Sequence, residues 1–283
     1  KMGIPMARKL LLSGQRLLGY DISEEARNQF MECGGLLTRS PEELVRGAAI
    51  IFTCLPDSTV WVDVAETRLT PHARQGQIFV DVGSTDPRQT KRFARLFARK
   101  GAMLVDAPVS GNLAGNTELV RIFCGGELSA FHKVRPMLEA IGNKEHVKHC
   151  GNSGNGQVVK ATDELARGLV ISSLLEALSF GINEGVRVEI LHDLLGGKIG
   201  WRGDLAAVCD HIERAGGDGI KTSPNAYRMF LEEARDKKFA LPMTRALHNA
   251  LRAIQKNAGD GSGEAIALWR ELTQRRRPQS GAT

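Results

Sequence analysis

The residues from Gly151 to Lys160 place three glycines within six positions and one lysine shortly after them. Glycine lets a backbone approach a ligand closely, since no Cβ stands in the way. The residues after Lys160 have a helical pattern, so the lysine is expected about one turn inside a helix. A lysine partly removed from water can have a lowered pKa and exchange protons with a substrate. On this stretch alone, a glycine-rich interdomain turn followed by a surface lysine explains the residues better than a catalytic site does.

The first 150 residues or so alternate between strand-like and helix-like patterns. Apolar runs with the character of buried parallel strands lie at 49–55, 78–82, 103–107 and 122–126, and a shorter one at 16–21. Helical patterns lie between them, including 24–33 after Ser23 and 41–45 after Ser40, two residues suited to N-caps. This alternation predicts an α/β fold with a doubly wound parallel sheet of the Rossmann type.

Gly3 lies 18 residues before Asp21 in the predicted sheet. In a dinucleotide-binding unit the last glycine of G-x-G-x-x-G precedes an acid by about that interval, and the acid takes the ribose hydroxyls. The first two glycines and the first strand would then fall upstream of Lys1. We therefore expect the sequence to begin inside this motif, with the first strand missing.

Composition excludes several classes of protein. The chain of 283 residues is 42% hydrophobic and 25% charged, which is typical of a globular protein. Five scattered cysteines form no CxxC pair, which argues against a disulfide framework or a metal site and for a reducing compartment. No apolar run approaches the ~18 residues of a membrane span. The basic run at 275–277 lacks interleaved aromatic residues, so we expect a solvated C-terminus and no nucleic-acid partner.

Five segments in order resemble the β-hydroxyacid dehydrogenases, the family of 3-hydroxyisobutyrate dehydrogenase that is related to 6-phosphogluconate dehydrogenase. The segments are KMGIPMA at 1–7, CLP at 54–56, DVGSTDP at 81–87, DAPVSG at 106–111 and GNGQVVK at 154–160. They are similar to the end of the family's GxGxMGxxMA opening, its LP turn, its DxST segment, its DxPVSGG substrate loop and its GxGxxxK helix start.

The resemblance implies roles for individual residues. Lys160 would be the catalytic general acid/base, and Ser110, Gly111 and Asn112 would form the loop that holds the substrate carboxylate. Asp163 and Glu164 would lie in the substrate-binding part of the helix. The cofactor would be lined by Met2, Gly3, Asp21, Leu55, Pro56 and Ser84. It would be NAD, with NADP less suited because the Asp21 carboxylate repels a 2′-phosphate and only Arg27 offers a distant cation.

Four positions depart from the family pattern. Asn112 replaces the second loop glycine, and Asp163 and Glu164 replace two asparagines that follow the lysine. An acid three residues from Lys160 shares its helical face, favours the charged lysine and repels a carboxylate substrate. The family's KDL lysine falls at Asn225, unless Lys221 substitutes for it.

The second half of the chain is predicted to be helical, with helices at 162–185, 188–195, 206–215, 227–237, 242–257 and 262–274. We therefore expect an NAD-binding Rossmann-like domain at 1–152 and an all-α substrate and dimerisation domain at 153–283, entered by a long helix. Trp201 fits either an aromatic contact to substrate or plain core.

These patterns lead to two hypotheses of function. The first is an NAD-dependent oxidoreductase acting on the CH–OH group of a small 3-hydroxy acid or on the related semialdehyde, polyol acid or imine. The second is a weakened family member that binds cofactor or partners. We expect a homodimer or homotetramer, located in the cytoplasm, or in the mitochondrial matrix if a targeting segment precedes Lys1.

Overall fold

The computed structural model describes residues 2–111, 120–183, 185–197, 203, 210, 224–236, 238 and 240–258. The chain divides into two compact units, Lys1–Lys160 (unit 1) and Ala161–Thr283 (unit 2). Unit 1 contains α/β structure, and every described element of unit 2 is a helix. The predicted fold class is therefore confirmed: a Rossmann-like α/β part is followed by a helical part.

Unit 1 alternates strands and helices along the chain. Its strands are β1 (Leu18–Gly19), β2 (Leu36–Leu37), β3 (Ile50–Thr53), β4 (Ile78–Asp81), β5 (Met103–Asp106), β6 (Val109–Ser110), β7 (Arg121–Cys124) and β8 (Val147–His149). Its helices are α1 (Gly3–Leu12), α2 (Glu24–Glu32), α3 (Pro41–Gly47), α4 (Ser58–Val64), α5 (Pro87–Arg99) and α6 (Leu128–Ile141), with short helical turns at η1 (Ala65–Leu69), η2 (Thr70–His72) and η4 (Lys144–His146). Helix α7 (Asn155–Asn183) begins in unit 1 and continues into unit 2.

Strands β3, β4 and β5 form the parallel centre that the apolar runs predict, in register from Ile50 beside Ile78 to Asp81 beside Asp106. Strands β1 and β2 pair in parallel as a separate sheet. The third sheet has the order β6-β7-β8, and β6 pairs with β7 antiparallel. The sequence patterns predict no strand at β6. It follows β5 without a crossover helix and continues the antiparallel pairing with β7 that includes the bridge between Asp106 and Gly125.

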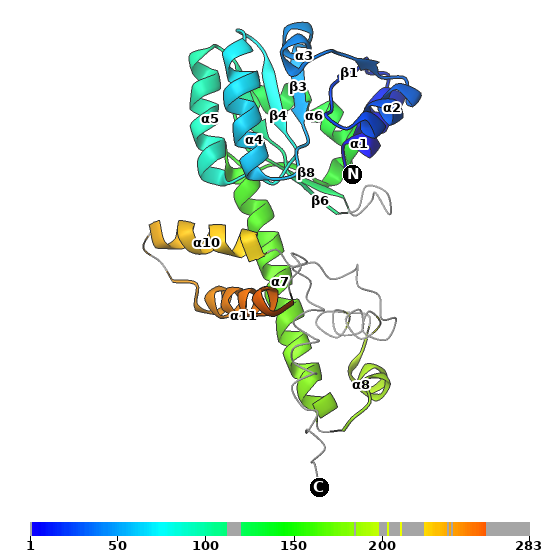
Figure 1. The fold of residues 1–283 in the computed structure, drawn as a ribbon, viewed down its shortest axis with the longest axis vertical. Coiled ribbons are helices and arrows are strands. Elements are labelled where there is room, and N and C mark those ends of the chain that lie inside the picture. The colour runs from blue at the N-terminus through cyan, green and yellow to red at the C-terminus, as the bar shows by residue number, and fades with distance from the viewer. Residues whose placement is uncertain are drawn as a thin grey trace. The chain divides into compact units, whose positions relative to one another are not determined.

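Residues of one strand alternate between two hydrophobic cores, as a doubly wound sheet requires. On β4, Ile78 and Val80 join a core with α1 and α6, whereas Phe79 joins a second core with α4 and α5. Figure 1 shows α4 and α5 to one side of β3 and β4, and α1 and α6 to the other. The second core includes Phe93 and Phe97 of α5, both fully buried, and each such side chain contributes roughly 1.5–3 kcal/mol.

Both predicted serine N-caps are confirmed. The hydroxyl oxygen of Ser23 accepts from the Ala26 N–H at 3.3 Å, and that of Ser40 accepts from the Glu43 N–H at 3.2 Å. Gly34 follows α2 with φ +95°, a conformation that ends a helix and that glycine adopts without strain.

The first predicted strand is shorter and more exposed than expected. It spans only Leu18–Gly19, and Leu18 and Tyr20 are 38% and 40% exposed. Among the described strands β1 pairs with β2 alone, so fewer neighbours cover it than cover β4. The ring of Phe30 fills the space beneath Gly19 and Gly35, where a Cβ would lie within 2.4 Å of it.

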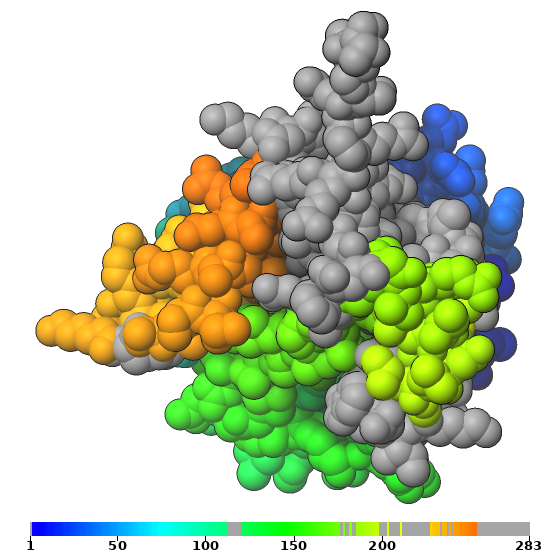
Figure 2. Space-filling model, turned by 90° about the horizontal axis from the view of Figure 1, so that it is seen from below, coloured from blue at the N-terminus to red at the C-terminus, as the bar shows by residue number. Residues whose placement is uncertain are grey.

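Unit 2 is built around the remainder of α7, with α8 (Val188–Leu195), α10 (Pro224–Asp236) and α11 (Pro242–Ala258). Its core consists of Leu174, Leu175 and Leu178 of α7, Tyr227 of α10, and Leu247 and Leu251 of α11. Helices α10 and α11 lie side by side (Figure 2). Of the predicted helix at 206–215 the structure describes residue 210 alone, which is helical. The predicted helix at 262–274 and the residue Trp201 lie outside the described residues.

Candidate functional site

The glycine-rich turn before Lys160 wraps around a carboxylate of the protein itself. The N–H of Gly154 donates to Oδ1 of Asp106 at 2.7 Å, and the N–H of Gln157 donates to Oδ2 at 3.0 Å. The Gly156 N–H also hydrogen-bonds this carboxylate. Asp106 ends β5, and these donors belong to the start of α7, so the carboxylate caps the N-terminus of that helix.

Gly125 and Gly156 have no Cβ, and this leaves space for the hydrogen bonds between Asp106 and the start of α7. A Cβ at Gly156 would lie 2.2 Å from the carbonyl oxygen of Phe123 and 2.8 Å from Oδ2 of Asp106. A Cβ at Gly125 would lie 2.6 Å from Oδ1 of Asp106. The close backbone approach inferred from the glycine spacing is therefore present, but the group approached is the end of the sheet.

Asp81, at the end of the neighbouring strand β4, is a second buried carboxylate. It accepts from the hydroxyls of Thr53 at 3.1 Å and Thr85 at 2.6 Å, and from the Gly83 N–H at 3.1 Å. Burial raises the pKa of Asp81 to about 6, while these donors hold it down in part and the charge of Asp106 raises it further. Burial also raises the pKa of Asp106, against the N–H donors of α7 that lower it.

Gln157 connects the two carboxylates. Its Nε2 donates to the carbonyl of Gly83 at 2.9 Å and lies 3.5 Å from Oδ2 of Asp81, and its Oε1 accepts from the Thr85 N–H at 3.1 Å. The backbone N–H of Gln157 donates to Oδ2 of Asp106. The side chain is 3% exposed, so the first turn of α7 is tied to the ends of both β4 and β5.

Lys160 lies in the second turn of α7 and is half-buried. The predicted start of the helix, at 162, is too late: the helix begins at Asn155, because Asp106 caps it there. Asp163 and Glu164 follow one turn later on the same helix, at spacings that place them on the face of Lys160.

The predicted substrate loop is described in part. Ser110 is 8% exposed in β6, where it pairs with Arg121, and Gly111 follows with φ +115°. Only glycine adopts that conformation readily, which explains the glycine in the motif. Asn112 lies outside the described residues.

The predicted cofactor residues gather at the carboxyl edge of the strands. Gly3 at the start of α1 is placed so that its Cβ would lie 3.9 Å from Cβ of Cys54, and the Cβ of Gly83 would lie 3.4 Å from the Leu55 carbonyl. The start of α1 and the loops that carry Leu55–Pro56 and Ser84 therefore adjoin one another. Desolvation raises the pKa of Cys54, and the charges of Asp81 and Asp21 raise it further, so Asp21 lies within electrostatic range of the same edge.

Asp21 and Arg27 belong to one tight turn. Oδ1 of Asp21 accepts from the Ser23 N–H at 2.8 Å, and the Arg27 guanidinium donates to the carbonyls of Asp21 and Ile22 at 2.8 and 3.0 Å. The guanidinium is thus held by backbone carbonyls beside the acid rather than standing apart from it. An exposed carboxylate just after β1 is of the type that accepts hydrogen bonds from the hydroxyls of a ribose.

In unit 2, Glu164 is associated with a buried tyrosine. Tyr227 is 2% exposed, and its hydroxyl lies where a Cβ on Gly168 would come within 1.9 Å. Burial, with a smaller contribution from the negative charge of Glu164, raises the pKa of Tyr227 to about 12. Asn225 lies in the first turn of α10, and Lys221 lies outside the described residues.

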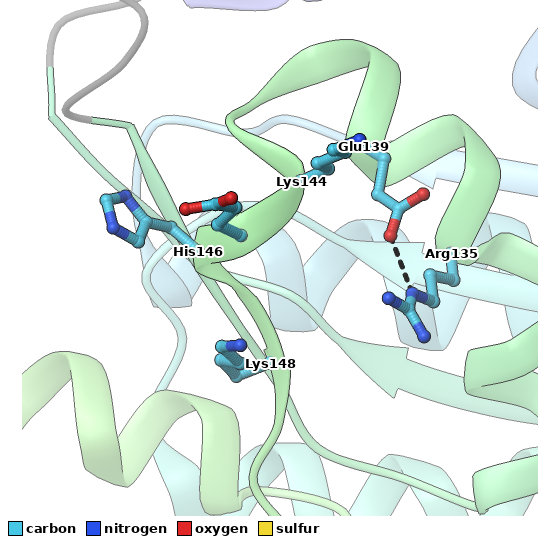
Figure 3. Close-up of a pocket in the computed structure, with 6 residues that line it drawn as sticks. Arg135, Glu139, Lys144, His146 and Lys148 are labelled. Atoms are coloured by element: carbon cyan, nitrogen blue, oxygen red, sulfur yellow. Dashed lines mark hydrogen bonds and ion pairs between the residues drawn. The ribbon is translucent and has the colours of Figure 1, made fainter.

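A separate open hollow of about 650 Å³ lies on unit 1 between α6, η4 and β8 (Figure 3). Arg135, Glu139, Lys144, Glu145, His146 and Lys148 line it. Two of these residues, Arg135 and Glu139, form an ion pair of 2.6 Å, and none of the predicted site residues lines the hollow.

The sequence patterns do not predict four residues that the structure brings to this site: Asp81, Asp106, Thr85 and Gln157. A signal for the two acids exists, because each ends a continuous apolar strand in which a carboxylate is costly unless hydrogen-bonded. Within the described parts of the chain, no helix is long and apolar enough to cross a membrane, and no group of three or more His, Cys, Asp or Glu could hold a metal.

Residues 1–151 match the family model described as the NAD binding domain of 6-phosphogluconate dehydrogenase. The chain is 28% identical to 2-(hydroxymethyl)glutarate dehydrogenase of Eubacterium barkeri over 282 residues, which covers 96% of this chain and 93% of that one. It is 32% identical to 2-hydroxy-3-oxopropionate reductase of Escherichia coli over 200 residues, 69% of this chain and 68% of that one.

The fold agrees with solved structures. The structure of Mycobacterium tuberculosis 3-hydroxyisobutyrate dehydrogenase with L-serine superposes with a TM-score of 0.82 at 22% identity, covering 97% of this chain and 96% of that one. This likeness is one of fold. Together with the family match, it shows that the chain belongs to the β-hydroxyacid dehydrogenase family and that its N-terminal part is an NAD-binding domain.

Proposed function

We propose that this protein is an NAD-dependent oxidoreductase that converts the CH–OH group of a small 3-hydroxy acid to the carbonyl, or reduces the semialdehyde in reverse, with Lys160 as general acid/base. One observation carries the proposal. Lys160 lies in the second turn of a helix whose first turn is tied, through Asp106 and Gln157, to the strand ends of an NAD-binding domain.

The chain's own residues supply binding and proton transfer. The neutral amine of Lys160 would take the proton of the substrate hydroxyl, and its ammonium form would stabilise alkoxide character in the transition state. The bound nicotinamide supplies the hydride acceptor or donor. Met2, Gly3, Leu55, Pro56 and Ser84 would line the cofactor, and Asp21 would accept hydrogen bonds from its ribose.

Ser110 and Gly111 would hold the substrate carboxylate through a hydroxyl and a backbone N–H. Both donor types suit an anion in a partly buried site, where hydrogen bonds to a charged acceptor are stronger than between neutral groups. Asn112 would complete this loop. Asp163 and Glu164 would repel a second carboxylate and favour a substrate with further hydroxyls or an amine.

Named relatives supply the panel of substrates to be tried. It contains 3-hydroxyisobutyrate, L-serine, 2-(hydroxymethyl)glutarate and, in the reducing direction, 2-hydroxy-3-oxopropionate. If Asp163 and Glu164 set the preference, L-serine, with one carboxylate and an ammonium, is turned over faster than the dicarboxylate.

The decisive experiment follows NAD reduction with the hydroxy acids of this panel, and NADH oxidation with 2-hydroxy-3-oxopropionate, for the wild type and the Lys160→Ala variant. Loss of a general acid/base lowers kcat by about 10²–10⁴-fold. Lys133→Ala, which removes an exposed lysine from α6, serves as the matched control and retains wild-type rates. Equal rates in the wild type and Lys160→Ala would refute the proposed mechanism.

The second candidate is a weakened family member that binds NAD without efficient turnover. Asp163 favours it, because this acid stands one turn from Lys160 where the family pattern has an asparagine, and its charge would repel a carboxylate substrate. NAD binding without turnover of any panel compound supports this candidate over the first.

We also propose a separate role for each of the two domains. Residues 1–152 would bind NAD, and 153–283 would complete the substrate site and join copies of the chain into a homodimer or homotetramer. Light scattering on the purified chain measures the assembly.

A further inference from the structure

We propose that Asp106 and Gln157 are positioning residues for Lys160, holding the ammonium in place through the first turn of α7. This inference rests on the proposed role of Lys160. Neither residue needs to touch substrate for it to hold, and both act through hydrogen bonds that the structure contains.

A carboxylate of the protein itself occupies the N-terminus of α7. A helix start presents N–H groups without partners in the helix, and these attract an anion. Here the anion is Asp106, which receives the Gly154 and Gln157 N–H groups at 2.7 and 3.0 Å and is fully buried. The substrate carboxylate therefore has to bind elsewhere, and this helix end is reserved for anchoring.

The Gln157 side chain restrains rotation of α7 about its own axis. A cap alone fixes where a helix starts along its axis. A side chain that hydrogen-bonds to a second element also restrains the rotation of the helix about that axis. The Gln157 amide provides that restraint, because it donates to Gly83 and accepts from Thr85 on the loop after β4. The Asp106 carboxylate, the Gly83 carbonyl and the Thr85 N–H therefore hold the first turn of α7 against the ends of β5 and β4.

The anchored first turn of α7 fixes the position of Lys160 in the second turn. Gln157 and Lys160 are three residues apart, so their side chains leave adjacent turns of α7 on the same face. The glycines at 154 and 156 offer no side chain to hold the turn, and the Asn155 amide between them donates to the Cys150 carbonyl at 3.0 Å, in the segment just before the helix. A loosened first turn would therefore displace Lys160, and a misplacement of about 1 Å at a reacting group can lower the rate roughly 10²-fold.

The test compares Asp106→Asn with the wild type. Asparagine has nearly the same size, but its amide nitrogen faces an N–H donor of α7 and cannot accept from it. We expect kcat to fall about 10–100-fold, while the dissociation constant for NAD, measured by fluorescence titration, changes less than about threefold. A fall in kcat matched by an equal loss of NAD binding would indicate a general structural defect and overturn the inference.

A milder variant guards against a failure to fold. Gln157→Ala keeps the Asp106 cap, removes the amide's contacts with Gly83, Thr85 and Asp81, and is expected to lower kcat several-fold at unchanged NAD affinity. The control is Ser40→Ala, which removes the cap of α3, lowers the unfolding temperature and leaves kcat unchanged.

A double-mutant cycle identifies Lys160 as the group through which the two residues act. In the Lys160→Ala background, Asp106→Asn and Gln157→Ala are expected to change the residual rate less than about twofold, since residues acting as a unit are not additive. Wild-type kcat in both single variants, with Lys160→Ala inactive, overturns this inference alone. Wild-type kcat in Lys160→Ala overturns the proposed function instead.

Discussion

At the scale of single residues, Asp81 stands out as a carboxylate that the fold surrounds completely. Its side chain is 1% exposed and accepts from Thr53, Gly83 and Thr85, yet burial still raises its pKa from 3.8 to about 6. Donors compensate desolvation only in part, so the protonated form is favoured in the folded protein relative to the unfolded chain.

This shift predicts a pH dependence of stability. Because the folded-state pKa is the higher one, the contribution of Asp81 is fully present below pH ~4 and is lost as pH rises through about 6. A shift of about 2 units corresponds to about 3 kcal/mol. The cost of Asp81→Asn, measured by urea unfolding, should therefore shrink by about that amount between pH 4 and pH 7. A cost independent of pH would contradict the assignment, and Asp63→Asn on the exposed face of α4 is the control.

At the scale of elements, the start of α7 depends on a glycine without a positive φ. Gly156 is required by contact distance, because a Cβ there would lie 2.2 Å from the Phe123 carbonyl, a backbone atom that cannot turn aside. Gly181, on the same helix, faces only the flexible end of Leu191 at 3.0 Å.

Substitution by alanine should therefore have opposite effects on stability at Gly156 and at Gly181. Gly156→Ala should destabilise the protein by about 1–3 kcal/mol, as other overpacked sites do, and lower kcat by displacing the first turn of α7. Gly181→Ala should be neutral or stabilising by up to about 1 kcal/mol, since alanine is the better helix former. Thermal unfolding of both variants measures the difference, and equal destabilisation would show that helix packing at 156 is looser than the distances indicate.

At the scale of the whole molecule, the NAD-binding domain should couple cofactor to stability. A ligand that binds only the folded state stabilises it by about 2.7 kcal/mol at a concentration 100 times its dissociation constant. NAD should raise the unfolding temperature more than NADP at the same concentration, because the exposed Asp21 carboxylate repels a 2′-phosphate.

The variant that tests this preference is Asp21→Asn, which removes the charge and keeps the size. NAD and NADP should each raise the unfolding temperature. The difference between the two rises should be smaller in Asp21→Asn than in the wild type, and it should be unchanged in Asp63→Asn. A difference of the same size in all three proteins would mean that Asp21 does not select the cofactor.

Much of the architecture follows from local patterns. The continuous apolar runs at β3, β4 and β5 indicate strands buried on both faces, and Ser23 and Ser40 mark helix starts through their own hydroxyls. Such signals depend on near neighbours in the chain, which is why they can be identified without the fold. The short strands β1, β2, β6 and β8 have too few residues to show a period.

The sequence by itself determined the family, the doubly wound sheet, and the candidate role of Lys160 after a glycine-rich turn. Only the tertiary structure decided what those glycines serve. Asp106 and Gln157 are 51 residues apart in the chain, and Asp81 and Gln157 are 76 apart, so no local pattern relates them. Their meeting depends on parallel strands that bring their carboxyl ends to one edge, where buried carboxylates must find donors, and the start of α7 provides them.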